Sequence, residues 1–172
     1  MNRVAPSIIH KRAVISKCGD YRYWLSREIL GAPKPKPIVF IMLNPSTADA
    51  EHDDPTIRRC ISFAKAWDGS HLIVVNLFAY RTTNPRTLWA EDTVDPVGQW
   101  NNDAIDRAMD YAYAWDGLVV AAWGEHGSYM GRNEDVLNRI QHTKPMCLKL
   151  NKSGNPAHPL YQPKDSVLIP IS

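Results

Sequence analysis

The chain has 172 residues, a length that favours a single domain spanning residues 1–172. Hydrophobic residues make up 44% and charged residues 22%, a balance that predicts a packed core and argues against global disorder. A net charge of +2 is too small to indicate nucleic-acid binding by itself. No apolar run approaches the roughly 20 residues of a membrane span, and the first residues lack the apolar segment of a secretory signal.

The three cysteines, Cys18, Cys60 and Cys147, are widely spaced and form no C-x-x-C pair. This spacing argues against a disulfide framework and against a zinc site. We therefore expect a cytoplasmic protein with no metal, no other cofactor and no membrane partner.

The first predicted element is an N-terminal β-hairpin over residues 11–30, in which two β-rich runs flank the turn at Gly19 and Asp20. A proline-rich stretch over residues 32–37 then predicts a stiff, extended connector to the main sheet.

Four short apolar runs predict the strands of that sheet, over residues 38–43, 72–75, 118–122 and 146–150. The first three are continuously hydrophobic, which is typical of strands buried on both faces of a parallel sheet. Helical periodicity separates the runs, over residues 56–67, 96–115 and 132–140. The alternation predicts an α/β fold, a three-layer αβα sandwich around a mostly parallel four-stranded sheet, with the hairpin added at its N-terminus.

Polar residues follow each predicted strand, and ligands of such folds bind where the carboxyl ends of the strands meet. Asn44 and Asn76 end the first two strands, and His158 lies in the loop after the fourth. An unsatisfied amide at the end of a buried strand costs about 1–3 kcal/mol, so both asparagines need partners. We expect these three residues to form the centre of a nucleobase- or nucleotide-sized pocket.

Four segments in this order resemble the uracil-DNA glycosylase superfamily across residues 38–161. Asn44-Pro45-Ser46 resembles the Gly-x-Asn-Pro-Gly motif of the mismatch-specific branch, and Asn76 follows at the second strand. The segment Val120-Ala-Ala-Trp123-Gly124-Glu-His126-Gly127 is similar to Leu-Trp-Gly-Ser-x-Ala, and His158-Pro159 resembles a shortened His-Pro-Ser loop. The whole chain, including residues 21–27 and 53–59, resembles more closely still an uncharacterised bacterial and phage family of unknown function.

The resemblance implies a role for each central residue. Asn44 would orient or activate the attacking water, and Asn76 would read the Watson–Crick edge of a flipped base. His158 would stabilise the negative charge that develops on the departing base. Such a protein would be a hydrolase of DNA modification or repair.

The chain also departs from the glycosylase pattern. Met42 stands where the motif usually begins with glycine, and Ser46 replaces its last glycine. After His158-Pro159, residues 160–163 replace the Ser-Pro-Leu-Ser wedge that enters duplex DNA, which argues against a duplex substrate. The four cysteines of the iron–sulfur branches are absent.

Further candidates surround the three central residues. Pro45, Ser46, Trp123, Gly124 and His126 are expected to contribute to the substrate site, with an anion held by the turn over residues 124–128. We expect stacking from Phe78 and Tyr80 and substrate contact from Arg81, with core packing as the alternative for the two aromatic rings. The candidates for phosphate binding are Arg58, Arg59 and Lys152. Asp54 and Pro55 predict the start of a helix, with Asp54 as its N-cap.

Three functions remain open. The first is an N-glycosidic hydrolase that acts on a normal or modified base in DNA or in a nucleotide. The second is a nucleotide- or nucleobase-binding module that has kept the pocket without the reaction. The third is a metal-dependent nucleotidyl or phosphoryl transferase that uses the acidic residues 49–54 with Arg58 and Arg59, although their spacing matches no known metal cage.

Overall fold

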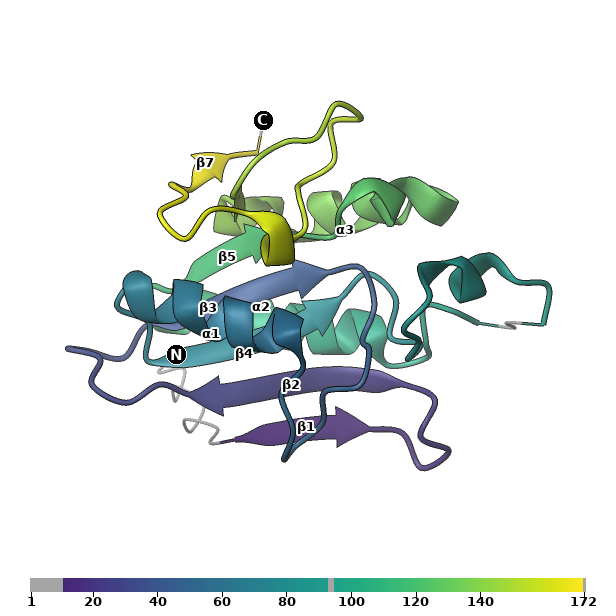
Figure 1. Ribbon diagram of the computed structural model, residues 1–172, viewed down its shortest axis with the longest axis horizontal. Coiled ribbons are helices and arrows are strands. Elements are labelled where there is room, and N and C mark those ends of the chain that lie inside the picture. Colours follow the sequence, from purple (N-terminus) through teal and green to yellow (C-terminus); the bar gives the residue numbers. More distant parts are fainter. Residues whose placement is uncertain (1–10, 93–94, 172) are drawn as a thin grey trace, which may run out of the picture.

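A computed structural model describes residues 11–92 and 95–171 and shows a mixed α/β fold (Figure 1). The strands are β1 (Arg12–Ile15), β2 (Arg22–Glu28), β3 (Pro37–Met42), β4 (His71–Asn76), β5 (Leu118–Ala121), β6 (Met146–Cys147) and β7 (Ile169–Pro170). The helices are α1 (Pro55–Ala66), α2 (Asn101–Ala114) and α3 (Arg132–Ile140), with short 3-10 turns η1 (Pro85–Trp89), η2 (Glu125–Gly131), η3 (Gln141–Thr143) and η4 (Pro159–Tyr161).

The strands form one sheet in the order β1-β2-β4-β3-β5-β6-β7. Strand β3 pairs in parallel with β4 on one side and β5 on the other, and β5 pairs in parallel with β6. The predicted α/β class is confirmed, but the prediction of a four-stranded sheet is wrong. The predicted hairpin does form, yet β2 also pairs antiparallel with β4 and so extends the sheet instead of standing apart from it. This pairing satisfies backbone groups of β4 that an edge position would leave without a partner.

Strands β3 and β4 are buried along their whole length. Alternate side chains of β3 enter two separate cores, since Val39 and Ile41 pack with α2 and α3 whereas Ile38 and Phe40 pack with α1. Figure 1 shows α1 in front of the sheet and α2 behind it. The continuous hydrophobicity of these strands therefore reflects burial on both faces.

Two predicted boundaries are corrected by local interactions of the backbone. Helix α2 begins at Asn101 and not at residue 96, because the Asp95 carboxylate accepts from the N–H groups of Val97 and Gly98 and closes a turn there. The strand predicted over residues 146–150 keeps only Met146 and Cys147, since Leu150 leaves the sheet to bridge with Pro156. Strand β7 was not predicted, because a two-residue strand has no periodicity. No helix in the described part of the chain has the length and apolarity needed to cross a membrane.

The loop between β3 and α1 is tied to β2 by the buried side chain of Arg27. Its Nε donates to the Asp53 carboxylate at 2.8 Å and its guanidinium also donates to the carbonyl oxygen of Asp49 at 2.5 Å. The Asp49 carboxylate in turn accepts from the N–H groups of Glu51 and His52, both at 2.8 Å. One buried cation thus fixes the path of the chain into α1.

We expect Arg27→Met to lower the free energy of unfolding by about 2–3 kcal/mol, because it leaves Asp53 and a loop carbonyl without their buried donor. Arg139→Met is the matched control, since the Arg139–Asp106 pair is as short, at 2.6 Å, but lies on the surface. It should cost less than about 1 kcal/mol. Urea denaturation measures both, and equal losses would contradict the anchoring role of Arg27.

Candidate functional site

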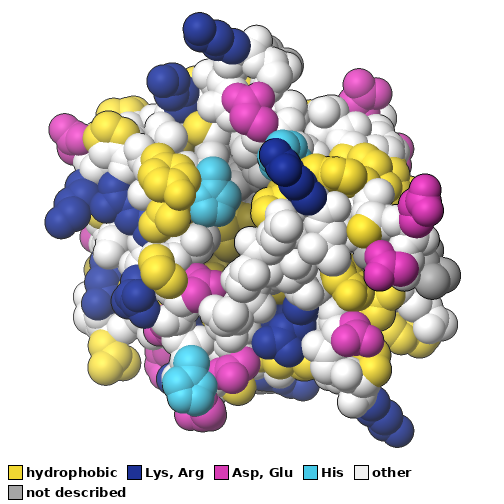
Figure 2. Space-filling view, turned by 45° about the vertical axis from the view of Figure 1, so that its right-hand side comes forward, with side chains coloured by type: hydrophobic (Ala, Val, Ile, Leu, Met, Phe, Trp, Pro, Cys, Tyr) yellow, Lys and Arg dark blue, Asp and Glu magenta, His cyan; other side chains and the backbone are white. Residues whose placement is uncertain are grey.

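A hollow of about 580 Å³ lies where the chain leaves the carboxyl ends of β3 and β5, and we call it the edge pocket. Figure 2 looks toward this side of the molecule and shows a surface hollowed near its centre, with histidine side chains beside the hollow. The polar lining residues are Arg22, Asn44, Ser46, Asp54, Thr56, Thr82, Thr83, Glu125, His126, Asn151, His158, Tyr161 and Gln162. The pocket therefore brings together Asn44 and His158, as the sequence predicts.

Hydrogen bonds fix the orientation of the Asn44 amide. Its Nδ2 donates to the carbonyl oxygens of Pro45 and Thr82, at 3.0 and 2.8 Å. Both amide hydrogens are thereby used, because only the nitrogen end of the amide can donate to two carbonyl groups. The remaining group, Oδ1, is an acceptor, and Asn44 lines the edge pocket.

The His158 ring is a neutral donor. Its Nδ1 accepts from the N–H of Leu160 at 3.3 Å, so in the neutral ring the proton resides on Nε2. Partial burial lowers the pKa of His158 below its ordinary value of 6.5, and the nearby Asp54 carboxylate opposes that shift. The residue therefore presents an uncharged N–H at neutral pH.

Three charged residues of the pocket, Arg22, Asp54 and Glu125, were not predicted as site residues. Asp54 caps α1 as predicted, with its carboxylate accepting from Ile57 N–H at 2.8 Å, and the residue also lines the pocket. Arg22 is 2% exposed and donates to the carbonyl oxygen of Ala48 at 2.9 Å. Its Nε is buried without a partner, and no carboxylate of the described residues forms an ion pair with it. Burial lowers the pKa of Arg22, and Asp54 partly offsets the effect.

Asn76 does not line the pocket. It is the last residue of β4, pairs in register with Met42, and is 1% exposed. Leu72 and Val74 pack on the side of α1, so the alternation of the strand directs Asn76 to that side as well. Neither of its amide atoms has a partner among the described residues. Asn76 therefore lies beside Met42, which does line the pocket, as an unsatisfied amide.

Predicted residues of the turn after β5 do line the pocket. Trp123 is buried, and its Nε1 donates to the Asn155 side chain at 3.1 Å. A Cβ on Gly127 would lie 2.0 Å from Trp123, so only glycine fits beneath the indole. Gly124 takes a φ of +76° that turns the chain toward His126, whose ring lies 5.2 Å from that of Trp89. Ser46 also lines the pocket, as predicted.

The structure places four other predicted substrate contacts outside the lining. The Pro45 carbonyl accepts from Asn44 and from the Thr82 N–H, which closes the loop. Phe78 is fully buried in the core with α2, and Tyr80 packs edge-on against Tyr21. Arg81 donates to the carbonyl oxygen of Gly19 in the hairpin turn, at 3.0 Å.

The predicted phosphate contacts also lie outside the lining. Arg58 donates to the carbonyl oxygen of Asp53 at 2.5 Å. Arg59 donates to the Gln162 carbonyl, with its guanidinium 5.0 Å from the centre of the Phe63 ring, and so ties α1 to the loop that carries His158. Lys152 is exposed in the turn after β6.

The acidic stretch before α1 is used for structure. Asp53 pairs with Arg27, and Asp54 caps α1. Backbone N–H groups of His52 and Glu51 lower the pKa of Asp49 to about 2, because they stabilise its charged form. Within residues 11–92 and 95–171, no group of three or more His, Cys, Asp or Glu side chains is placed to hold a metal ion.

These features define an α/β protein with a polar pocket at the carboxyl edge of a mixed sheet. The family model described as "Protein of unknown function (DUF1643)" matches residues 22–160, and the chain belongs to that family. No curated protein and no solved structure matches the chain. The comparisons thus agree with the resemblance to a family of unknown function and give no support for membership of the uracil-DNA glycosylase superfamily.

We expect His158 to titrate below pH 6.5 and to carry its neutral-state proton on Nε2, which nitrogen-15 NMR of the imidazole measures directly. The unfolded chain then binds the proton more readily than the folded one. The contribution to stability is therefore complete above pH 6.5 and is lost as the pH falls through the lowered pKa of the folded state. His158→Gln should remove this part of the acid dependence of unfolding. A ring that titrates at or above 6.5 would contradict the description.

Proposed function

We propose that the edge pocket binds a nucleobase, in a nucleotide or in DNA, and that the protein hydrolyses its N-glycosidic bond. The observation that carries the proposal is the pairing of Asn44 and His158 in one pocket, the first as a fixed acceptor and the second as a neutral donor. A volume of about 580 Å³ also lies within the usual range of small-molecule sites.

Hydrolysis of this bond needs a positioned water and a stabilised leaving group. Asn44 Oδ1 accepts a hydrogen bond from a water molecule, and the oxygen of that water attacks the anomeric carbon. The C–N bond breaks with its electron pair moving to the base, and the N–H of His158 donates to the base oxygen that becomes negative. A neutral donor suits this task, because the charged imidazolium forms only at acidic pH and the neutral ring is the species present near pH 7.

Asp54 supplies a carboxylate that the Asn-Pro segment lacks. The carboxylate caps α1 and the residue also lines the pocket, so it is the group that takes the proton of the attacking water. Arg22 lies in the same lining, and its positive charge interacts with this carboxylate. Three different residues of the pocket thus position the water, stabilise the departing base and accept the proton.

The charges of the lining favour an uncharged ring over a phosphate group inside the pocket. Arg22 is opposed by the two carboxylates of Asp54 and Glu125, so the charged groups do not add up to a positive site. Asn76, one step from the lining beside Met42, offers a donor and an acceptor of the kind that a base edge pairs with.

A binding module without cleavage is the second candidate, and the position of Asn76 favours it. The amide that the hydrolase would use to read the base does not line the pocket, so the pocket lacks one of the three residues expected for cleavage. The third candidate, a metal-dependent transferase, has no such observation in its favour, because the acidic residues on which it depends hold the loop and cap the helix.

The test uses mass spectrometry of base release from nucleotides and single-stranded oligonucleotides with normal and modified bases. We expect His158→Ala to lower the rate of release by about 100- to 1,000-fold, the usual loss for a donor to developing negative charge. Asn44→Ala should lower the rate of base release by a similar factor and should weaken ligand binding by a smaller factor. His142→Ala and Asn138→Ala are matched controls, since neither residue lines the edge pocket.

Calorimetry with the same ligands separates the candidates. Binding that depends on Asn44 and His158 without any released base would select the binding module. Base release that is unchanged in both variants would remove the edge pocket from consideration as the active site.

A further inference from the structure

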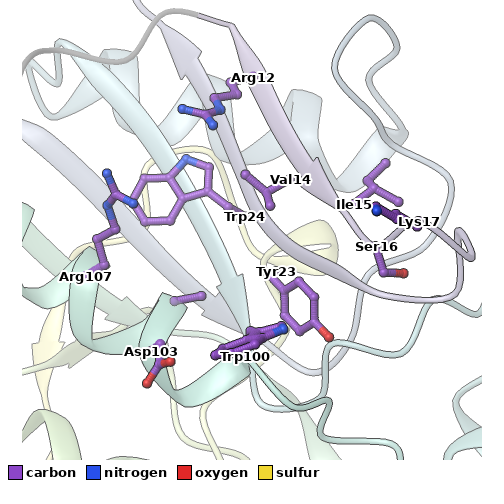
Figure 3. A pocket seen from close by; sticks show the side chains of 11 residues that line it. Arg12, Val14, Ile15, Ser16, Lys17, Tyr23, Trp24, Trp100, Asp103 and Arg107 are labelled. Atoms are coloured by element: carbon purple, nitrogen blue, oxygen red, sulfur yellow. The ribbon is translucent and has the colours of Figure 1, made fainter.

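A second hollow, of about 420 Å³, lies between the β1–β2 hairpin and the start of α2 (Figure 3), and we call it the hairpin hollow. It shares no lining residue with the edge pocket. Three aromatic rings, from Tyr23, Trp24 and Trp100, form much of its wall.

A β-bulge in β2 creates this wall. Val14 pairs with Trp24 while Ile15 pairs with Arg22, so Tyr23 is the extra residue of the strand. In a regular strand Tyr23 and Trp24 would face opposite sides of the sheet, whereas here both line the hairpin hollow. Bulges of this kind commonly redirect a side chain toward a site.

Trp100, the residue directly before α2, completes the wall. Its side chain is 56% exposed, an unusual position for so large an apolar group. Figure 3 shows its indole facing the space below Tyr23 and Trp24. Tyr23 and Trp24 are 9% and 4% exposed, so Trp100 supplies the exposed aromatic face on which a planar ring can stack.

The rim of the hollow is cationic. Arg12, Lys17 and Arg107 line it together with a single acid, Asp103. In Figure 3 the guanidinium groups of Arg12 and Arg107 both lie beside the Trp24 indole. Two guanidinium groups spaced around an aromatic wall are suited to a phosphate attached to a stacked ring.

We infer that the hairpin hollow binds a nucleotide unit, with its base stacked on Trp100 and its phosphate held by Arg12 and Arg107. The aromatic rings distinguish this ligand from an inorganic anion, and the three cations distinguish it from an uncharged apolar molecule. The site goes beyond the proposed function, because it uses neither Asn44 nor His158. A free nucleotide and a single-stranded oligonucleotide share this chemistry.

The test measures binding of thymidine 5′-monophosphate by calorimetry and of fluorescein-labelled octathymidylate by anisotropy. We expect Trp100→Ala and Arg107→Glu each to weaken the binding of the preferred ligand by about tenfold or more. Tyr113→Ala is the matched aromatic control, because Tyr113 is 73% exposed on α2 and lies outside the hollow. Lys65→Glu makes the same charge change on α1 and should leave binding within about twofold of the wild type.

The two ligands identify the source of the nucleotide unit. A nucleic-acid strand is supported if octathymidylate binds at least tenfold more tightly than the monophosphate and only Trp100→Ala and Arg107→Glu lose affinity. Equal affinities with the same losses support a free nucleotide. Binding that is unchanged in Trp100→Ala and Arg107→Glu, or absent for both ligands, would overturn the inference. Binding that disappears only in Asn44→Ala and His158→Ala would also overturn it, while leaving the proposed function in place.

Discussion

The parallel, in-register pairing of β3 with both β4 and β5 is the constraint on which the edge pocket depends. Because β3 lies between two parallel neighbours, all three chains leave the sheet at the same edge. Backbone hydrogen bonds continue beyond the strands, from Leu77 N–H to the Met42 carbonyl and from Ala122 N–H to the Ile41 carbonyl, both at 2.8 Å. The segments that carry the polar side chains are therefore held at fixed positions where they diverge, and the space between them is the pocket.

How much of this arrangement was predictable depends on the range of the interactions. Continuous apolar runs predict β3, β4 and β5, because burial on both faces removes polar residues from a strand. Placing Asn44 and His158 at one edge followed from the direction of parallel strands alone. Arg22 was missed, because it stands next to Tyr23 and Trp24, and this aromatic run indicates only a hairpin. The other residues that line the edge pocket are distant from Arg22 in the sequence. Asp54 was predicted as a helix cap, but its second role depends on where α1 begins relative to the sheet.

Asn76 shows the opposite limit. Its position at the end of a buried strand was predicted from the sequence, and the alternation from Leu72 also determines the side of the sheet that it faces. The local sequence pattern does not show which side chain of the neighbouring strand lies beside Asn76. The register of the two strands places Met42 there and not a smaller residue. Membership of the pocket is in this case a property of the pairing between two strands and not of either strand alone.

The bulge in β2 links the two hollows in a way that the sequence does not reveal. In a regular strand Arg22 and Trp24 would share a face, because side chains alternate with a period of two. Here Trp24 packs in the core with α2 and lines the hairpin hollow, whereas Arg22 reaches the loop before α1 and lines the edge pocket. One extra residue, Tyr23, thus sends a cation to one side of the sheet and an aromatic ring to the other. If Tyr23 instead occupied a regular position in the strand, Arg22 and Trp24 would lie on one face, so the charge of the edge pocket and the aromatic wall of the hairpin hollow depend on the same irregularity in the sheet.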